Sequence, residues 1–227
     1  MKLDMQPLEP GNLSVRAYQA LKEGLIAGQF RPGQRLVMQK LADMLGTSIT
    51  PVREACLRLV SEGSLEMRSG RFAAVPALTR DRYLEVRTIR LSLEGLATAL
   101  AAKNATEENV EDLRRLQEEF EGLDYEGNSI QAQLHNRDFH FAVYRLSQMS
   151  ILIGHIESLW ASMGPMLTVF FNEGEHRYVG GLEHRNVIAG IRAGDSKRAK
   201  KAMRKDILLG GEDFMRFLNS NEQFSVS

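Results

Sequence analysis

The sequence contains few residues that could cross-link the chain or anchor it in a membrane. Cys56 is the one cysteine among 227 residues, so a disulfide within the chain is impossible and a buried packing role is expected. The longest uncharged run, 158–172, is too short to span a bilayer and contains Gly164-Pro165. No apolar leader follows Met1. We therefore expect a protein of the reducing cytoplasm that does not enter a membrane.

The chain also lacks an excess of charge of one sign. Its 29 Lys and Arg residues balance 29 Asp and Glu residues, which argues against a protein that coats nucleic acid without specificity. The charges are uneven along the chain, with ten basic against seven acidic residues through Pro76 and nineteen against twenty-two beyond it. The hydrophobic content of 43% is sufficient for a sizeable core. A mildly basic N-terminal part thus precedes a larger, mildly acidic part.

A helix-turn-helix is predicted over residues 38–60. Its first helix, 38–45, ends at Gly46. The second helix carries apolar residues at i, i+3, i+4, i+7 and i+8, namely Val52, Ala55, Cys56, Leu59 and Val60. Its other face presents Thr50, Arg53, Leu57 and Arg58. One face is therefore core, and the other is available to a partner.

The start of the second helix is suited to phosphate. Ser48 or Thr50 can cap it, because a side-chain oxygen there can accept a bond from the first turn. Pro51 fits that turn, which has no use for the missing N–H. The helix N-terminus is then free to face the negative charge of a nucleic-acid backbone.

A wing is predicted after this helix. Residues 64–68 and 71–75 form two short strands around Ser69-Gly70, with Arg68 and Arg71 beside the tip. Helical pairs occur in many domains, but a helical pair with a basic wing is a nucleic-acid-binding arrangement. The candidate contacts to double-stranded DNA are Ser48, Thr50, Arg53, Arg58, Arg68, Gly70 and Arg71.

Residues 13–76 resemble the winged helix of GntR-family transcription regulators. The matching segments, in family order, are Ile26-Ala27-Gly28 with Arg31-Pro32-Gly33, then Leu41-Ala42-Asp43-Met44-Leu45-Gly46, then Thr50-Pro51-Val52-Arg53-Glu54-Ala55, then Glu62-Gly63. The resemblance implies that Arg53 contacts guanine or phosphate and that Gly70 lets the wing approach the minor groove. The chain departs from the family at Val37-Met38-Gln39-Lys40 and at Ile49, so an operator sequence cannot be transferred to it.

Beyond Thr79 every segment has the pattern of a helix, and no strand is needed. The predicted helices are 80–103, 106–123, 129–148, 151–171 with a kink at Gly164-Pro165, 182–193 and 195–219. The first of them is expected to bury Val86, Ile89, Leu93, Leu96 and Leu100. The fold class is therefore mainly α, with an N-terminal winged helix-turn-helix and an antiparallel bundle of six or seven helices. The expected divisions are a tail (1–11), the winged helix (12–76), a linker (77–80), the bundle (81–220) and a second tail (221–227).

Four polar residues lie on the apolar faces of three of these helices. They are Asn136, His140, His184 and Asp206. An unsatisfied buried polar group costs about 1–3 kcal/mol, so we expect them to meet inside the bundle. Two interpretations stay open, a histidine–aspartate network that only satisfies itself and a site for a divalent transition metal such as Zn, Ni, Mn or Fe.

Residues 81–215 resemble the FCD effector domain of FadR-like GntR regulators. The matching segments are Arg90-Leu91-Ser92-Leu93-Glu94, Asn136-Arg137-Asp138-Phe139-His140 and 184–195. In that family an Asp or Asn and three histidines bind a metal that holds a small carboxylate effector, and an arginine contacts the effector. The resemblance implies metal ligands at Asn136, His140, His184 and Asp206, the last in place of a histidine, and effector contacts at Arg90, Asn136 and Tyr144. Arg90 could instead be a surface arginine whose stem covers apolar surface.

The sequence therefore predicts a cytoplasmic, homodimeric, ligand-responsive transcription regulator, which in this family is most often a repressor. Two winged helices would bind the half-sites of a pseudo-palindromic operator, and the bundle would sense a small organic acid with or without a metal. An alternative is a metal-dependent enzyme with a two-His-one-carboxylate centre. Another is a protein-interaction adaptor with a degenerate winged helix, against which Arg53, Arg58, Arg68 and Arg71 argue.

Overall fold

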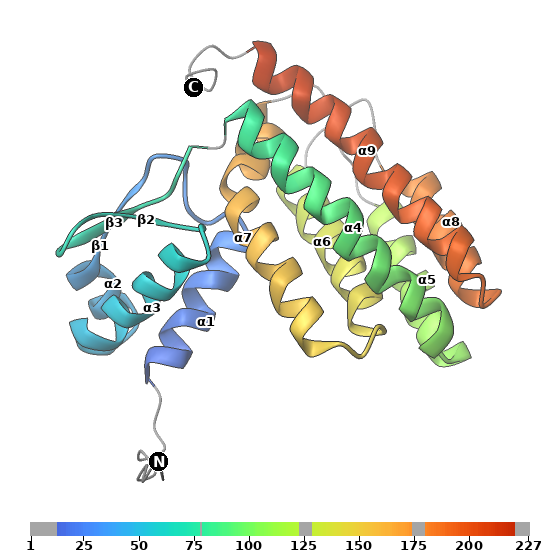
Figure 1. Ribbon diagram of the computed structural model, residues 1–227, viewed down its shortest axis with the longest axis horizontal. Helices are drawn as coiled ribbons and strands as arrows, with labels where there is room; N and C mark the ends of the chain where they lie inside the picture. The colour runs from blue at the N-terminus through green and yellow to red at the C-terminus, as the bar shows by residue number, and fades with distance from the viewer. Residues whose placement is uncertain (1–12, 78, 123–128, 174–179, 221–227) are drawn as a thin grey trace, which may run out of the picture.

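The computed structural model describes residues 13–77, 79–122, 129–173 and 180–220, which form a small winged helix beside a larger helical bundle (Figure 1). The tails expected at 1–11 and 221–227 lie outside these residues. The winged helix comprises α1 (Leu13–Ile26), β1 (Arg35–Val37), α2 (Met38–Met44), α3 (Ile49–Ser61), β2 (Glu66–Ser69) and β3 (Phe72–Ala74). The bundle comprises α4 (Arg80–Asn104), α5 (Glu107–Glu121), α6 (Ser129–Arg145), α7 (Ser150–Glu173), α8 (Gly181–Arg192) and α9 (Ser196–Ser220). The predicted fold class is confirmed.

The recognition helix α3 buries the face that its apolar spacing predicts. Val52, Cys56 and Leu59 are fully buried, whereas Arg53 is exposed. The start of the helix differs in one respect from the prediction. Ser48 is the N-cap residue, but its side chain makes no capping hydrogen bond, and Thr50 lies inside the helix. The first turn of α3 therefore keeps its N–H groups available to another acceptor.

The wing belongs to a three-stranded antiparallel sheet in the order β1-β3-β2. Its first strand, β1, was not predicted, because it is three residues long and runs directly into α2. Leu36 pairs with Ala73 in the centre of the sheet, and both side chains are buried. The sheet thus ties the wing to the segment that precedes the helix-turn-helix.

Three of the bundle helices, α4, α5 and α9, begin at side chains that cap them. Thr79 accepts a bond from the backbone N–H of Arg82, and Thr106 forms a reciprocal capping box with Asn109 at the start of α5. The carboxylate of Asp195 accepts bonds from the first turn of α9. These are the hydroxyl and acidic residues that the sequence marks as helix starts.

The buried face of α4 differs from the prediction. Ile89 and Leu96 are 40% and 42% exposed, and Arg90 and Glu94 are buried in their place. The buried charges are tolerated because each meets a partner of opposite sign inside the bundle, which an apolar count along one helix cannot reveal. An apolar strip of α4 is consequently left facing outward.

Helix α7 lies between the winged helix and the rest of the bundle (Figure 1), and it packs closely against α1. A Cβ added at Gly164 would lie 2.0 Å from the carbonyl oxygen of Leu25, and one added at Gly28 would lie 1.6 Å from the hydroxyl of Thr168. The helix continues through Pro165. None of the helices among the described residues combines the length and hydrophobicity needed to cross a membrane.

Candidate functional site

The surface expected to meet DNA is formed by the N-terminal half of α3 and by the wing. Ser48, Thr50 and Arg53 are exposed at the former, and Gly70 and Arg71 are exposed at the latter. Arg68 is exposed too and forms an ion pair with Glu66 of its own strand. Because short polar groups surround a cation at a helix N-terminus, this surface has the chemistry to bind phosphate and a base edge. The individual contacts stay predictions.

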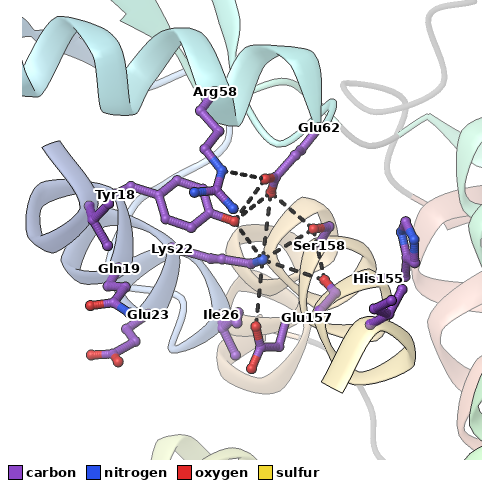
Figure 2. A pocket seen from close by; sticks show the side chains of 13 residues that line it. Tyr18, Gln19, Lys22, Glu23, Ile26, Arg58, Glu62, His155, Glu157 and Ser158 are labelled. Carbon is purple, nitrogen blue, oxygen red and sulfur yellow. Dashed lines mark hydrogen bonds and ion pairs between the residues drawn. The ribbon is translucent and has the colours of Figure 1, made fainter. Parts of the chain in front are cut away.

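Arg58 lies at the other end of α3, away from this surface. Its guanidinium stacks on the ring of Tyr18 at 3.7 Å, and its Nε lies 3.3 Å from Glu62 (Figure 2). Tyr18 belongs to α1, and Glu62, which follows α3, accepts a bond from Tyr18. The structure therefore gives Arg58 a role in joining α3 to α1, and its predicted contact with DNA is not tested.

A buried polar site lies inside the bundle, where α6, α8 and α9 meet. The Nε2 atom of His140 is 3.1 Å from Oδ2 of Asp206, and the Nε2 atom of His184 is 3.6 Å from Oδ1 of the same carboxylate. The three ligand atoms lie within 4.8 Å of one another, and all three residues are buried. Asn136 is half-buried one helical turn before His140. Three of the four predicted residues thus meet in space, and the ligand role of Asn136 stays a prediction.

Hydrogen bonds assign the tautomer of each imidazole. Nδ1 of His184 donates to Oε1 of Gln117 at 2.8 Å, since the amide nitrogen of Gln117 already donates to Glu121. Nδ1 of His140 is 2.7 Å from the hydroxyl of Tyr144. That hydroxyl donates to a carboxylate, so its oxygen accepts from His140. Both Nε2 lone pairs consequently face Asp206.

Burial keeps His184 neutral. The side chain is fully buried, and burial lowers its pKa to about 4. The charge of Asp206 acts in the opposite direction and raises the pKa, while His140 lowers it further. Its ring stacks on Phe139 with centroids 4.1 Å apart. A neutral imidazole is the form that ligates a metal, and the Nε2 atom of His184 has no hydrogen-bond partner among the residues that the structure describes.

These residues fit a divalent transition metal. With metal–nitrogen and metal–oxygen bonds of about 2.0–2.2 Å, neighbouring ligand atoms lie about 3.0–3.5 Å apart. The two distances to Asp206 are close to that range. Nδ1 atoms held by an amide and a hydroxyl also provide the outer contacts that orient histidine ligands.

A charged network adjoins the histidines. Arg90 is buried, which rules out the surface alternative, and its Nε is 2.6 Å from Oε1 of Glu94. Glu94 also accepts from the hydroxyl of Tyr144 at 2.6 Å and from the indole of Trp160 at 3.0 Å. Burial and the Glu94 carboxylate raise the pKa of Tyr144 far above its usual value, so this hydroxyl keeps its proton. The network connects His140 to α4 and α7.

Glu94 and Trp160 are functional candidates that the sequence analysis missed. One signal was available for Glu94, because it lies four residues after Arg90, the spacing of an ion pair on one helix face. Trp160 gave none, since a lone tryptophan on an apolar helix has the pattern of ordinary core.

Comparison with known proteins identifies the two parts of the chain. Residues 13–75 match the family model described as bacterial regulatory proteins, gntR family, and residues 85–208 match the model of the FCD domain. The chain belongs to the GntR family. The predicted resemblance is confirmed over both parts, and with it the assignment to DNA-binding transcription regulators that carry a ligand-binding FCD domain.

Individual GntR relatives agree with this assignment. The HTH-type transcriptional regulator McbR of Escherichia coli is 40% identical over 156 residues, covering 69% of this chain and 71% of that protein. The solved structure of E. coli McbR/YncC matches with a TM-score of 0.82 at 30% identity, covering 93% of this chain and 100% of the other. A probable D-xylose utilization operon transcriptional repressor of Paenarthrobacter nicotinovorans is 28% identical, covering 78% of this chain and 77% of that protein. The family points to a regulator, and nothing in it supports the enzyme alternative.

Proposed function

We propose that this GntR regulator is a cytoplasmic homodimer that represses transcription from a pseudo-palindromic operator, and that its FCD domain holds a divalent transition metal on His140, His184 and Asp206. The observation that carries the metal proposal is the lone pair of His184 Nε2, which finds no hydrogen-bond donor in the described part of the chain and faces a buried carboxylate and a second imidazole. A network that only satisfied itself would leave no such atom, because an unpaired buried polar group is unfavourable.

The proposed effector is a small carboxylate bound to that metal. Three protein ligands leave at least one coordination position for a water or an anion. Arg90 is already paired with Glu94, so the metal would supply most of the positive charge that attracts the effector. Asn136 is the proposed polar neighbour of the anion, since it lies on α6 one turn before His140, whereas the hydroxyl of Tyr144, predicted as an effector contact, already donates to Glu94.

The proposed dimer is formed by two copies of this chain. Ile89 and Leu96 on α4 are large apolar residues left exposed along one helix, and a second copy would cover them. A twofold dimer presents two recognition helices, each able to enter one half-site of a symmetric operator. The weak basicity of the winged helix supports this arrangement, because the contacts of two such surfaces with DNA add together in a dimer.

Metal analysis of purified variants tests the site. The wild type should carry about one equivalent of a transition metal per chain, as one site with three protein ligands implies. His140→Ala and His184→Ala should lose the metal, whereas Asp206→His should retain it, because imidazole is also a good ligand. His155→Ala is the matched control, since His155 is exposed on α7. A folded wild type without metal after dialysis against zinc would reject the metal proposal and leave the histidines as partners of Asp206.

A further inference from the structure

Helix α7 touches both functional parts of the molecule at positions two residues apart. Ser158 faces the winged helix, where its hydroxyl donates to Glu62 at 2.9 Å. Trp160 faces the bundle, where its indole donates to Glu94 and its ring lies 5.5 Å from that of His140. Residues i and i+2 of a helix point in nearly opposite directions. A single turn of α7 therefore contacts the DNA-binding domain on one side and the buried site on the other.

The contact on the winged-helix side is a partly buried group of polar residues that line a pocket, which we call the interdomain cluster: Tyr18, Lys22, Glu62 and Ser158 (Figure 2). The ammonium of Lys22 donates to the Tyr18 hydroxyl at 2.8 Å and to the Ser158 hydroxyl at 3.2 Å, and it lies 3.6 Å from Glu62. Tyr18 donates to Glu62 at 2.8 Å. The cluster thus joins α1, the C-terminal end of α3 and α7.

The contacts of Lys22 make the cluster sensitive to the position of α7. Lys22 is only 6% exposed, and its remaining oxygen neighbours, the carbonyl of Gly154 and the carboxylate of Glu157, are also on α7. Burial alone would raise the pKa of Glu62. The hydrogen bonds from Tyr18 and Ser158, together with the cationic neighbours of Glu62, have the larger combined effect, so the pKa of Glu62 is lowered. If α7 moved, Lys22 and Glu62 would each lose partners that stabilise their charges. Such a contact favours one arrangement of the domains over intermediate ones.

We propose that α7 transmits between the buried site and the winged helix, and that the interdomain cluster is the contact through which a change at either site reaches the other. A ligand that shifts Trp160 or Glu94 displaces α7, and α7 carries Ser158 away from Glu62 at the end of the recognition helix. The inference deepens the proposed function but depends on it only for the identity of the ligand. By linkage, the coupling must also run from DNA to the buried site.

Reciprocity allows a test that needs no known effector. Trp160 is the one tryptophan of the chain, so its emission reports the buried site alone. A duplex selected from random sequences by the wild-type protein should change the emission of Trp160 and its quenching by acrylamide. The change should be absent in Ser158→Ala and in Glu62→Gln, although both variants still bind the duplex. Unaltered labelling of the buried thiol of Cys56 would show that their winged helix remains folded.

A matched variant and a zinc titration complete the experiment. Glu111→Gln, which breaks the exposed pair with Arg114 on α5, should behave as wild type. Zinc returned to protein stripped of metal by a chelator should change the wild-type affinity for the duplex by about fivefold or more, the lower end of ordinary coupling, and the affinity of the cluster variants by less than about twofold. The inference is overturned if the duplex leaves wild-type Trp160 unchanged, or if the cluster variants respond as wild type does. Loss of the zinc effect alone, with the duplex effect intact, rejects the metal proposal and not the coupling.

Discussion

At the scale of single residues, the neutral imidazole of His184 determines how the bundle responds to acid. Its pKa of about 4 lies below the ordinary value of 6.5, so the unfolded chain takes up a proton in a range where the folded chain does not. The stability that results is complete above pH 6.5 and is lost as the pH falls through about 4. With metal removed by a chelator, this group should account for a loss of about 3 kcal/mol between these limits.

Denaturant unfolding at a series of pH values measures this effect. The relevant quantity is the difference between wild type and His184→Gln, since other groups titrate equally in both. His155→Gln should follow the wild type, because that histidine is exposed. Parallel pH profiles for wild type and His184→Gln would contradict the assignment of a neutral, buried imidazole.

Arg53 is the residue on which operator recognition should depend most. If it reads a guanine, Arg53→Ala should weaken binding by about 1–3 kcal/mol and relax specificity at one position. If it contacts phosphate, all duplexes should be bound more weakly, and the salt slope should fall by about 1. Gel retardation at several salt concentrations distinguishes these results, with Arg114→Ala on α5 as the control. An Arg53→Ala variant with unchanged affinity and slope would exclude Arg53 from the contacts.

The residues of the buried site were predictable to different degrees. His140, His184 and Asp206 were found because each breaks an apolar stripe, and one helix is enough to show that. Trp160 and Gln117 were not found, because their partners lie on other helices, and Glu94 was overlooked although Arg90 lies four residues before it on the same helix. Lys22 was missed for the same reason, since its oxygen neighbours on α7 lie more than 130 residues away in sequence.

At the scale of elements, the packing of α7 on α1 should depend on one glycine. The Cβ of Gly164→Ala would lie 2.0 Å from a backbone oxygen of α1, so one helix must shift, and overpacking of this kind costs about 1–3 kcal/mol. Gly154 lies on the same helix, but a Cβ there meets nothing within 4 Å. Gly154→Ala should therefore stabilise the protein by about 0.5–1 kcal/mol.

Thermal or urea unfolding of the two glycine variants measures this contrast. Gly164→Ala should also weaken the response of Trp160 to DNA, because the displaced helix belongs to the coupling element. Equal stability of the two variants would mean that the close approach of α7 to α1 is not maintained in solution.

The elements themselves were largely predictable, and the differences have clear causes. Helices with a strong period and a capping residue, such as α5 after Thr106, were found at nearly their observed limits. Strand β1 was missed because three residues give no detectable alternation. The face of α4 was misassigned because a buried ion pair, Arg90 with Glu94, took the inner side that apolar residues were expected to fill. The spacing of apolar residues therefore predicted the wrong buried face for α4, the helix that carries the charged part of the buried site.

At the scale of the whole molecule, assembly should depend on the exposed strip of α4. Replacing Ile89 and Leu96 together by glutamate places like charges opposite one another across a twofold contact, so the dimer should dissociate. Analytical ultracentrifugation should show a monomer, and a footprint should shrink from two half-sites about 34 Å apart to one. Leu182→Glu, at an exposed leucine of α8, is the control. A double variant that still sediments as a dimer would show that the contact lies elsewhere.

The division of α1 between two neighbours limits how regulators of this kind can be recombined. Although α1 opens the winged helix in sequence, Lys22 finds most of its oxygen acceptors on α7 of the bundle. A hybrid that joined residues 13–76 to the bundle of another relative would place a buried ammonium against a foreign helix. Such a hybrid would bind its operator, but the effector of its new bundle would no longer change that binding. The response would return if Gly154, Glu157 and Ser158 were transferred together with the winged helix. The unit that can be exchanged is therefore larger than the DNA-binding domain and includes one face of a helix that begins 74 residues after Pro76.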